Sequence, residues 1–118
     1  MAPLMMRVAP YATLRKLLPL PGQDLDWALC CEAIEALRAL DTTPQDPVHH
    51  AEGDVGTHTR WVIACLREDA TFQQALPDRQ WVMFMAALLH DIAKPATTVV
   101  DEATGRIRQP GHSQRGAV

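Results

Sequence analysis

Three side chains that could bind one metal ion lie in two separate stretches of the sequence. His90 and Asp91 are neighbours at the end of the apolar run ALLHDIAKP, His58 lies in the earlier stretch GTHTRW, and Lys94 follows Asp91 by one helical turn. Two imidazoles and a carboxylate suit divalent cations such as Zn²⁺, Mn²⁺, Fe²⁺ or Mg²⁺. Such a metal, held with open positions, activates water for attack on phosphorus, and a lysine can contact phosphate as a point charge.

Each of these residues also has an ordinary structural explanation. A histidine at the C-terminal end of a helix suits the helix dipole, so the His90–Asp91 pair could simply be a hydrogen-bonded helix terminus. His58 on an apolar helix face could be a core histidine that donates to a backbone carbonyl. The combination favours the metal site, because the three groups occur on two helices whose ends should meet.

Two predicted helices must position these groups. The first runs from about Thr57 to about Glu68 and carries His58 on its apolar side. That apolar side consists of Trp61, Val62, Cys65 and Leu66. If the two helices pack antiparallel, the start of the first lies beside the end of the second, next to the His-Asp pair.

The second helix of this pair has Asp78 as its expected N-cap. It ends at or before Lys94, because a residue that precedes proline is disfavoured in a helix. Its apolar residues cover so much of the circumference that it must be central. They are Trp81, Val82, Phe84, Met85, Leu88 and Leu89.

A further helix is predicted earlier in the chain, from about Leu25 to Leu40, with Asp24 as its N-cap. Its apolar stripe consists of Leu25, Leu29, Ala33, Ala36, Leu37 and Leu40. Residues 1–23 read as an irregular lead-in with one helical turn near Thr13–Leu18, and residues 24–118 as one helical domain. Strands are too few for a sheet, so we predict an all-α fold.

The end of the chain is predicted to hold a loop or small hairpin between Pro95 and Pro110, with Gly105 at its turn. A helix is then expected to begin at Gly111 and His112.

Composition excludes several classes of protein. The 118 residues carry a net charge of −3, which argues against a broad basic surface for duplex DNA. The three cysteines, Cys30, Cys31 and Cys65, form no CxxC pair and read as reduced thiols. Prolines interrupt the apolar N-terminus, and no run reaches the roughly 18 apolar residues of a membrane span. We therefore expect a cytoplasmic domain with no membrane partner.

Three motifs together resemble the HD-domain metal-dependent phosphohydrolases. They are GDVGTHTRWVIACL, FMAALLHDIAKP and GHSQRGAV, within about residues 45–118. They are most similar to the HD domain of bacterial tRNA nucleotidyltransferases and of related RNA-repair proteins. The resemblance implies an HD-type helical bundle and a divalent metal, whose identity among Mn, Ni, Mg, Fe and Zn stays open.

The resemblance also implies roles for individual residues. His58 would be the first metal ligand, and His90 and Asp91 the signature pair, with Asp91 part of the catalytic machinery. Lys94 matches a lysine that contacts substrate phosphate, and His112 matches a histidine that binds a second metal or the substrate. His49 and His50 match an adjacent loop only loosely, and we expect them to be ordinary loop residues.

The sequence departs from the family pattern at one point. Members carry a further aspartate on a helix well downstream of the HD pair, whereas the only later carboxylates here are Asp101 and Glu102, in the expected hairpin. We therefore expect a bundle that is incomplete at its C-terminus, whose exposed apolar face is covered by a larger parent chain or by an oligomer.

Three functions follow from these expectations. The leading one is hydrolysis of phosphomonoesters or phosphodiesters in nucleotides or RNA ends by a metal-activated water. The second is a catalytically incomplete helical module of a larger RNA-processing protein. The third is a plain structural domain with a chance His-Asp pair. A polymerase activity is not expected, because the nucleotidyltransferase head with its paired acidic motif is absent from this sequence.

Overall fold

A computed structural model describes residues 7–44, 53–97, 99–100 and 107–108 of the chain. Within these residues the fold is helical, which confirms the all-α prediction and is consistent with an HD-type bundle. The elements in chain order are α1 (Tyr11–Arg15), α2 (Trp27–Ala33), the 3₁₀ helix η1 (Glu35–Thr42), α3 (Val55–Glu68), α4 (Ala70–Gln74), α5 (Pro77–Leu89), α6 (Lys94–Thr97), β1 (Val99–Val100) and β2 (Ile107–Arg108).

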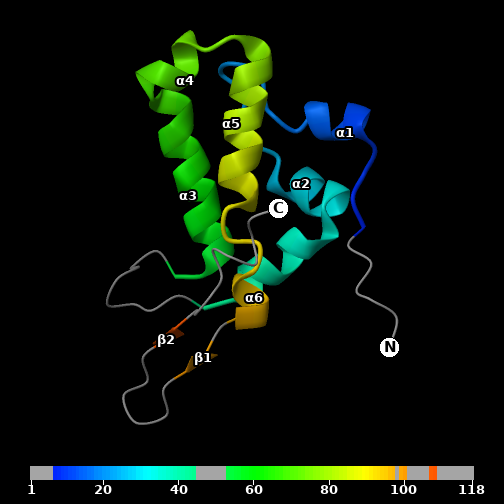
Figure 1. The fold of residues 1–118 in the computed structure, drawn as a ribbon, viewed down its shortest axis with the longest axis vertical. Coiled ribbons are helices and arrows are strands. Elements are labelled where there is room, and N and C mark those ends of the chain that lie inside the picture. The colour runs from blue at the N-terminus through cyan, green and yellow to red at the C-terminus, as the bar shows by residue number, and fades with distance from the viewer. Residues whose placement is uncertain (1–6, 45–52, 98, 101–106, 109–118) are drawn as a thin grey trace.

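Helices α3 and α5 form the antiparallel pair that the sequence predicts. They lie side by side in Figure 1, joined at one end by α4, so that the start of α3 and the end of α5 share the opposite end of the pair. The 3₁₀ helix η1 packs against α3, and α2 packs against η1, so that these two elements close the core. The buried core cluster consists of Leu17, Cys30, Cys31, Ala33, Ile34, Leu37, Leu40, Val55, Ile63, Phe84 and Leu88.

The single helix predicted from Leu25 to Leu40 is wrong, because it is broken at Ile34. This residue has an extended backbone (φ −129°, ψ 94°) and pairs with Val8 of the lead-in. Backbone hydrogen bonds join Ala9 N to Ala33 O (2.7 Å) and Glu35 N to Arg7 O (3.0 Å). Around Ile34, some of the hydrogen bonds of a continuous helix are replaced by pairing with residues 7–9. No local sequence pattern reveals this pairing.

The region also differs from the prediction in its N-cap residue and in the apolar residues that face the core. The N-cap is Asp26 instead of the predicted Asp24, and its side chain accepts a hydrogen bond from Leu29 N at 3.0 Å. Leu29, predicted to be inward, is 39% exposed, whereas Cys30 and Ile34 are buried.

The lead-in packs on the domain. Leu17 belongs to the buried core, and Trp81 of α5 donates its indole N–H to Leu14 O at 3.0 Å. Helix α1 overlaps the helical turn predicted near Thr13–Leu18, but it begins at Tyr11 and ends at Arg15. Gly22 has the positive φ (83°) expected of a turn glycine. The division of the chain at residue 24 stays a prediction.

The inward face of α3 differs from the prediction. Its buried residues are Val55, Gly56, Thr59 and Ile63. Trp61 is 58% exposed and Cys65 is exposed, although both were predicted to face the core. The sequence offers apolar side chains on two faces of this helix, and only the packing of η1 and α5 decides which face is buried.

Helix α5 begins earlier than predicted, with Leu76 at the N-cap, Pro77 in the first turn and Asp78 within that turn. It is central, as predicted, since Phe84 and Leu88 are fully buried, but Val82 is 58% exposed. The short helix α4 before it was not predicted.

The C-terminal hairpin is confirmed where the structure describes it. Strands β1 and β2 pair antiparallel, with Val99 opposite Arg108 and Val100 opposite Ile107. Helix α5 ends before Lys94, as predicted, although the short α6 then begins there with Pro95 in its first turn.

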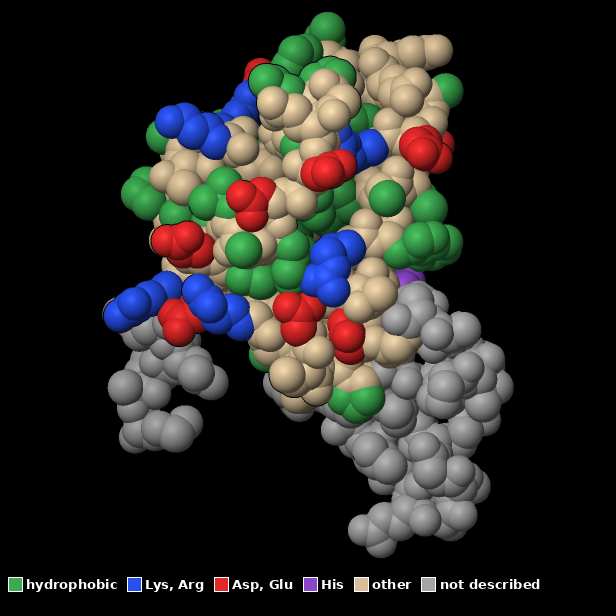
Figure 2. All heavy atoms as spheres, turned by 180° about the vertical axis from the view of Figure 1, so that it is seen from behind, with side chains coloured by type: hydrophobic (Ala, Val, Ile, Leu, Met, Phe, Trp, Pro, Cys, Tyr) green, Lys and Arg blue, Asp and Glu red, His purple; other side chains and the backbone are tan. Residues whose placement is uncertain are grey.

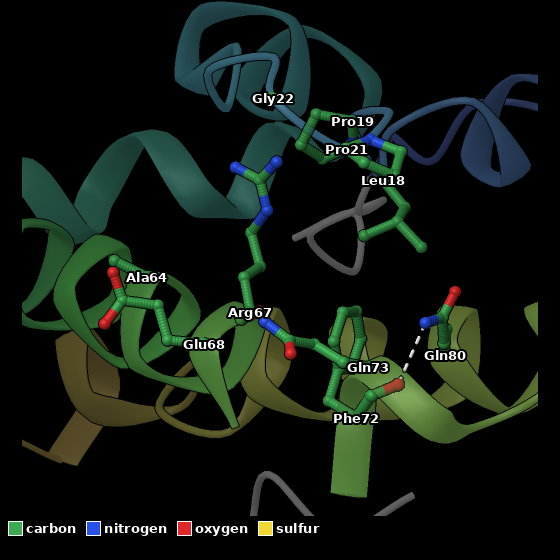
Figure 3. Close-up of a pocket in the computed structure, with 10 residues that line it drawn as sticks. All are labelled: Leu18, Pro19, Pro21, Gly22, Ala64, Arg67, Glu68, Phe72, Gln73 and Gln80. Atoms are coloured by element: carbon green, nitrogen blue, oxygen red, sulfur yellow. Dashed lines mark hydrogen bonds between the residues drawn. The ribbon is translucent and has the colours of Figure 1, made fainter. Parts of the chain in front are cut away.

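A hollow lies at the C-terminal half of α3, away from His58. Its lining combines the turn around Gly22 with α3, α4 and α5 (Figure 3). Arg67 holds the turn by donating to Leu20 O at 3.3 Å and Gln23 O at 2.7 Å, and Gln80 donates to Phe72 O at 2.9 Å.

The face drawn in Figure 2 carries acidic and basic side chains side by side, without a broad field of either sign. Among the described residues, no helix combines the length and apolar character needed to cross a bilayer.

Candidate metal centre

The first turn of α3 fixes the position of His58. The Asp54 carboxylate accepts a hydrogen bond from Thr57 N at 2.7 Å and so caps the helix, while His58 N donates to Asp54 O at 3.1 Å. This cap sets where the helix begins. It therefore determines that His58 lies at the end of α3 that meets the end of α5.

The end of α5 presents the other two groups. His90 is the C-cap, and the following turn is held by backbone hydrogen bonds from Ile92 N to Leu89 O (3.1 Å) and from Lys94 N to Asp91 O (3.0 Å). The turn directs Asp91 inward, where it is 3% exposed, and leaves His90 at the surface.

His58, His90 and Asp91 form a group that can hold a metal ion. One potential ligand atom of each lies within 4.8 Å of the others. Asp91 Oδ2 is the common point, at 2.9 Å from His90 Nε2 and 4.0 Å from His58 Nε2. The two imidazole rings have centroids 5.7 Å apart. The predicted meeting of these residues at the helix ends is therefore present in the fold.

The backbone fixes the tautomer of His90. Its Nδ1 lies 2.6 Å from Ala87 O, and because a carbonyl can only accept, Nδ1 carries the proton of this hydrogen bond. The opposite nitrogen, Nε2, is directed at Asp91. In neutral His90 this atom has a lone pair, as a metal ligand requires, and such a partner on the far nitrogen is typical of metal-binding histidines.

The ionisation of the pair follows from its contacts. The hydrogen bond to Asp91 raises the pKa of His90, against the opposing effect of burial. Burial alone would raise the pKa of Asp91, but the hydrogen bond and charge of His90 together with those of Lys94 lower it to about 2. Asp91 is thus an anion at neutral pH, and its Oδ2 atom is approached by both His90 and Lys94.

Lys94 forms an ion pair with Asp91. Its Nζ lies 3.1 Å from Asp91 Oδ2, and its side chain is 6% exposed. The ammonium group of Lys94 therefore contacts the buried carboxylate of Asp91. The sequence predicted contact with substrate phosphate, and that role stays a prediction.

The donor set fits a divalent metal. Two imidazole nitrogens and one carboxylate oxygen are ligands shared by zinc and other first-row cations, and three protein ligands leave positions for water or substrate. Bonds of about 2.1 Å require ligand atoms no more than about 4.2 Å apart. The 4.8 Å spread of the cluster means that the side chains would close slightly around an ion.

A second polar cluster supports the other side of α3, and no local sequence pattern indicates it. Asp41 accepts hydrogen bonds from Trp27 Nε1 (2.9 Å) and Arg60 NH1 (3.0 Å), and Arg60 also reaches Thr57 Oγ1 (3.2 Å) and stacks over the Trp27 ring. A side chain on Gly56 would collide with the Asp41 carboxylate. This close approach ties η1 to the turn of α3 that carries His58.

Several predicted residues lie outside the described part of the chain. They are His49, His50, Asp101, Glu102 and His112. One residue beside the cluster was assigned to the core by sequence: Trp61, whose ring centroid lies 6.0 Å from that of His58.

Comparison with known proteins gives one informative similarity. A multifunctional CCA protein from Halorhodospira halophila (strain DSM 244 / SL1) is 40% identical to this chain over 78 residues, which is 66% of the chain and 16% of the relative. The matched segment thus spans about a sixth of that protein. No family model and no solved structure matches the chain. The chain is similar to part of a multifunctional CCA protein and carries a His-His-Asp group suited to a metal ion.

Proposed function

We propose that this chain is a divalent-metal-dependent phosphohydrolase domain that acts on nucleotides or RNA ends. The observation that carries the proposal is the convergence of His58 Nε2 and His90 Nε2 on Asp91 Oδ2. The resemblance of the surrounding motifs to HD domains supports the reaction class. The similarity to a multifunctional CCA protein supports a substrate from nucleotide or RNA chemistry.

Each residue has a defined task in this proposal. His58, His90 and Asp91 hold the metal, and the Ala87 carbonyl keeps the Nε2 lone pair of His90 directed at it. When bound, a divalent cation lowers the pKa of water and neutralises phosphate oxygens. Lys94 balances the charge of Asp91 from the buried side and orients its carboxylate.

The required loss of a proton from His90 makes metal binding depend on pH. Because Asp91 raises the pKa of His90, protons compete with the metal for Nε2 to a higher pH than for an ordinary histidine. The affinity for metal should therefore rise with pH until His90 is deprotonated.

One observation favours a second candidate, a helical module of a larger RNA-processing protein without turnover. The ion pair between Lys94 and Asp91 already neutralises the buried carboxylate. The cluster could then serve as a polar link between α3, α5 and α6, with no need for a metal.

Metal binding and turnover separate the two candidates. The chain, stripped of metal with EDTA, is titrated with Mn²⁺ in a calorimeter and then assayed with bis-p-nitrophenyl phosphate and with 2′,3′-cyclic AMP in Mn²⁺, Ni²⁺ or Mg²⁺. We expect saturable binding and hydrolysis, both lost in the double variant His90→Ala, Asp91→Ala. Asp41→Asn is the matched control, because it changes a carboxylate near the same helix.

The outcomes are distinct. Binding with turnover supports the phosphohydrolase. Binding without turnover supports a module that keeps the metal ligands but has lost catalysis. The absence of binding in the parent chain overturns the metal site and leaves the cluster as a polar link between the helices.

A further inference from the structure

Trp61 differs from the other two tryptophans of the chain. Trp27 and Trp81 are half-buried, and their indole N–H groups donate to Asp41 and to Leu14 O. Trp61 is 58% exposed. The first two rings therefore fasten elements of the fold together, whereas the third leaves most of its surface open to solvent.

The position of Trp61 on α3 is unrelated to the core. The core residues Thr59 and Ile63 are each two positions away, and at about 100° per residue this puts them on the opposite side of the helix. His58 is three positions away, about 60° round the helix, so Trp61 borders the metal group. The ring centroids of Trp61 and His58 are 6.0 Å apart and the ring planes are inclined by 37°.

A bound phosphate would thus lie close to an open aromatic surface. His58 contacts Trp61 on one side and His90 on the other, with ring centroids 6.0 and 5.7 Å apart. A group held at the cluster is therefore one imidazole ring away from the indole.

We infer that Trp61 is the stacking platform for the base of a nucleotide whose phosphate is bound at the His58–His90–Asp91 group. The inference rests on the proposed function for the phosphate, and adds the residue that recognises the rest of the ligand. Every base has a flat π face, and stacking on an exposed aromatic side chain binds bases with little sequence preference. The ligand class is thus a nucleotide or a single-stranded RNA end, without selection of one base.

The test compares two probes that share a phosphate and differ in the base. Adenosine 5′-monophosphate and ribose 5-phosphate are titrated into the metal-loaded chain and into two variants, Trp61→Leu and Trp61→Phe. One stacked base typically contributes about 1–3 kcal/mol, so we expect the adenosine compound to bind about 5- to 150-fold more tightly than the base-free one in the parent chain.

The variants assign this difference to the ring. In Trp61→Leu the two probes should bind equally, while affinity for ribose 5-phosphate and for the metal stays unchanged. In Trp61→Phe most of the preference should return. The nucleotide should also quench tryptophan fluorescence in the parent chain, and this quenching should disappear in Trp61→Phe although binding persists.

The failures are distinguishable. Equal affinity for both probes in the parent chain, or a preference that survives Trp61→Leu, overturns the stacking platform and leaves the metal site intact. If neither probe binds the metal-loaded chain, the proposed function fails and the platform fails with it. A fluorescence change that follows protein concentration and ignores nucleotide would identify Trp61 as a protein contact, and would also overturn the inference.

Discussion

Two carboxylates, Asp41 and Asp91, lie on opposite sides of the first turns of α3. They differ in exposure and in the groups that contact them. The Asp41 side chain is 40% exposed, and its partners are an indole and a guanidinium, neither of which loses its proton in the ordinary pH range. The Asp91 side chain is 4% exposed and faces two imidazoles and an ammonium group. The indole and guanidinium that donate to Asp41 keep their protons. A metal ion, in contrast, can replace a proton on the His90 Nε2 atom that faces Asp91.

The difference shows how to separate a structural carboxylate from a binding one. Both accept close hydrogen bonds, and both connect distant segments. What distinguishes Asp91 is burial together with a histidine whose far nitrogen is already fixed by the backbone.

The largest effect is expected on metal affinity when the two carboxylates are replaced one at a time. Asp91→Asn should weaken Mn²⁺ binding by more than about 100-fold, because loss of an outer-shell partner alone typically costs 10- to 100-fold. Asp41→Asn should retain binding. Calorimetric titration of both variants measures the difference, and equal losses in the two would remove the distinction between the carboxylates.

The second test concerns Asp91 and measures how the free energy of unfolding changes at acid pH. The pKa of Asp91 is lowered in the folded state, to about 2 from the ordinary 3.8. The charge of Asp91 therefore stabilises the fold above the unfolded pKa, and this contribution is lost as pH falls from about 4 to about 2. At 1.36 kcal/mol per pKa unit it amounts to roughly 2 kcal/mol.

Urea unfolding of EDTA-treated protein between pH 5 and pH 2 measures this contribution. The free energy of unfolding of the parent chain should fall by roughly 2 kcal/mol more than that of Asp91→Asn. Parallel pH profiles would show that the His90 and Lys94 contacts do not stabilise the ionised form.

Gly56→Ala tests the structural side. Alanine favours a helix by up to about 1 kcal/mol over glycine, but its Cβ would collide with the Asp41 carboxylate. We expect a net loss of about 1–2 kcal/mol of unfolding free energy, as for other overpacked sites. Part of it should return in the double variant Gly56→Ala, Asp41→Ala, measured by urea unfolding; a stabilised single variant would contradict the close approach.

The smallest effect is expected for Arg60→Lys. Lysine keeps the charge near Asp41 but loses the planar group that lies over Trp27, with Cζ 4.7 Å from the ring centroid. Because this ion pair is exposed at the surface, the loss should stay below about 1 kcal/mol. The thermal midpoint measures it, and a larger loss would mean that the second cluster contributes more than a surface contact.

The parts of the fold that local pattern could predict are those that local contacts determine. The strongly apolar α5 and the HDIAKP turn after it were predicted, and so was the meeting of His58 with His90. Helix α3 was predicted too, although it begins at Val55, two residues before the predicted Thr57. The C-terminal hairpin followed from its turn residues. For the individual elements the signal is a proline, a turn residue or a periodicity within a few residues, whereas the meeting of His58 with His90 followed from pairing the two helices antiparallel.

The errors occur where distant segments decide. The helix break at Ile34 depends on Val8, and nothing near Ile34 announces it. Two faces of α3 are apolar enough to be buried, so Trp61 was wrongly placed in the core. Helix α4 was missed although its cap is readable, since Asp69 accepts from Thr71 N and Phe72 N.

The hydrogen bond from His90 to Ala87 O has a consequence for how the site can change. The tautomer depends on a main-chain atom, so every side chain at position 87 that preserves the helix also preserves the proton on Nδ1. Ala87 packs against the core, so small substitutions there should keep the site intact. An insertion or deletion of one residue within the last turn of α5 would still leave a carbonyl three residues before His90, but it would turn the imidazole by about 100° away from His58 on α3. The site is thus robust to substitution and vulnerable to a change in length.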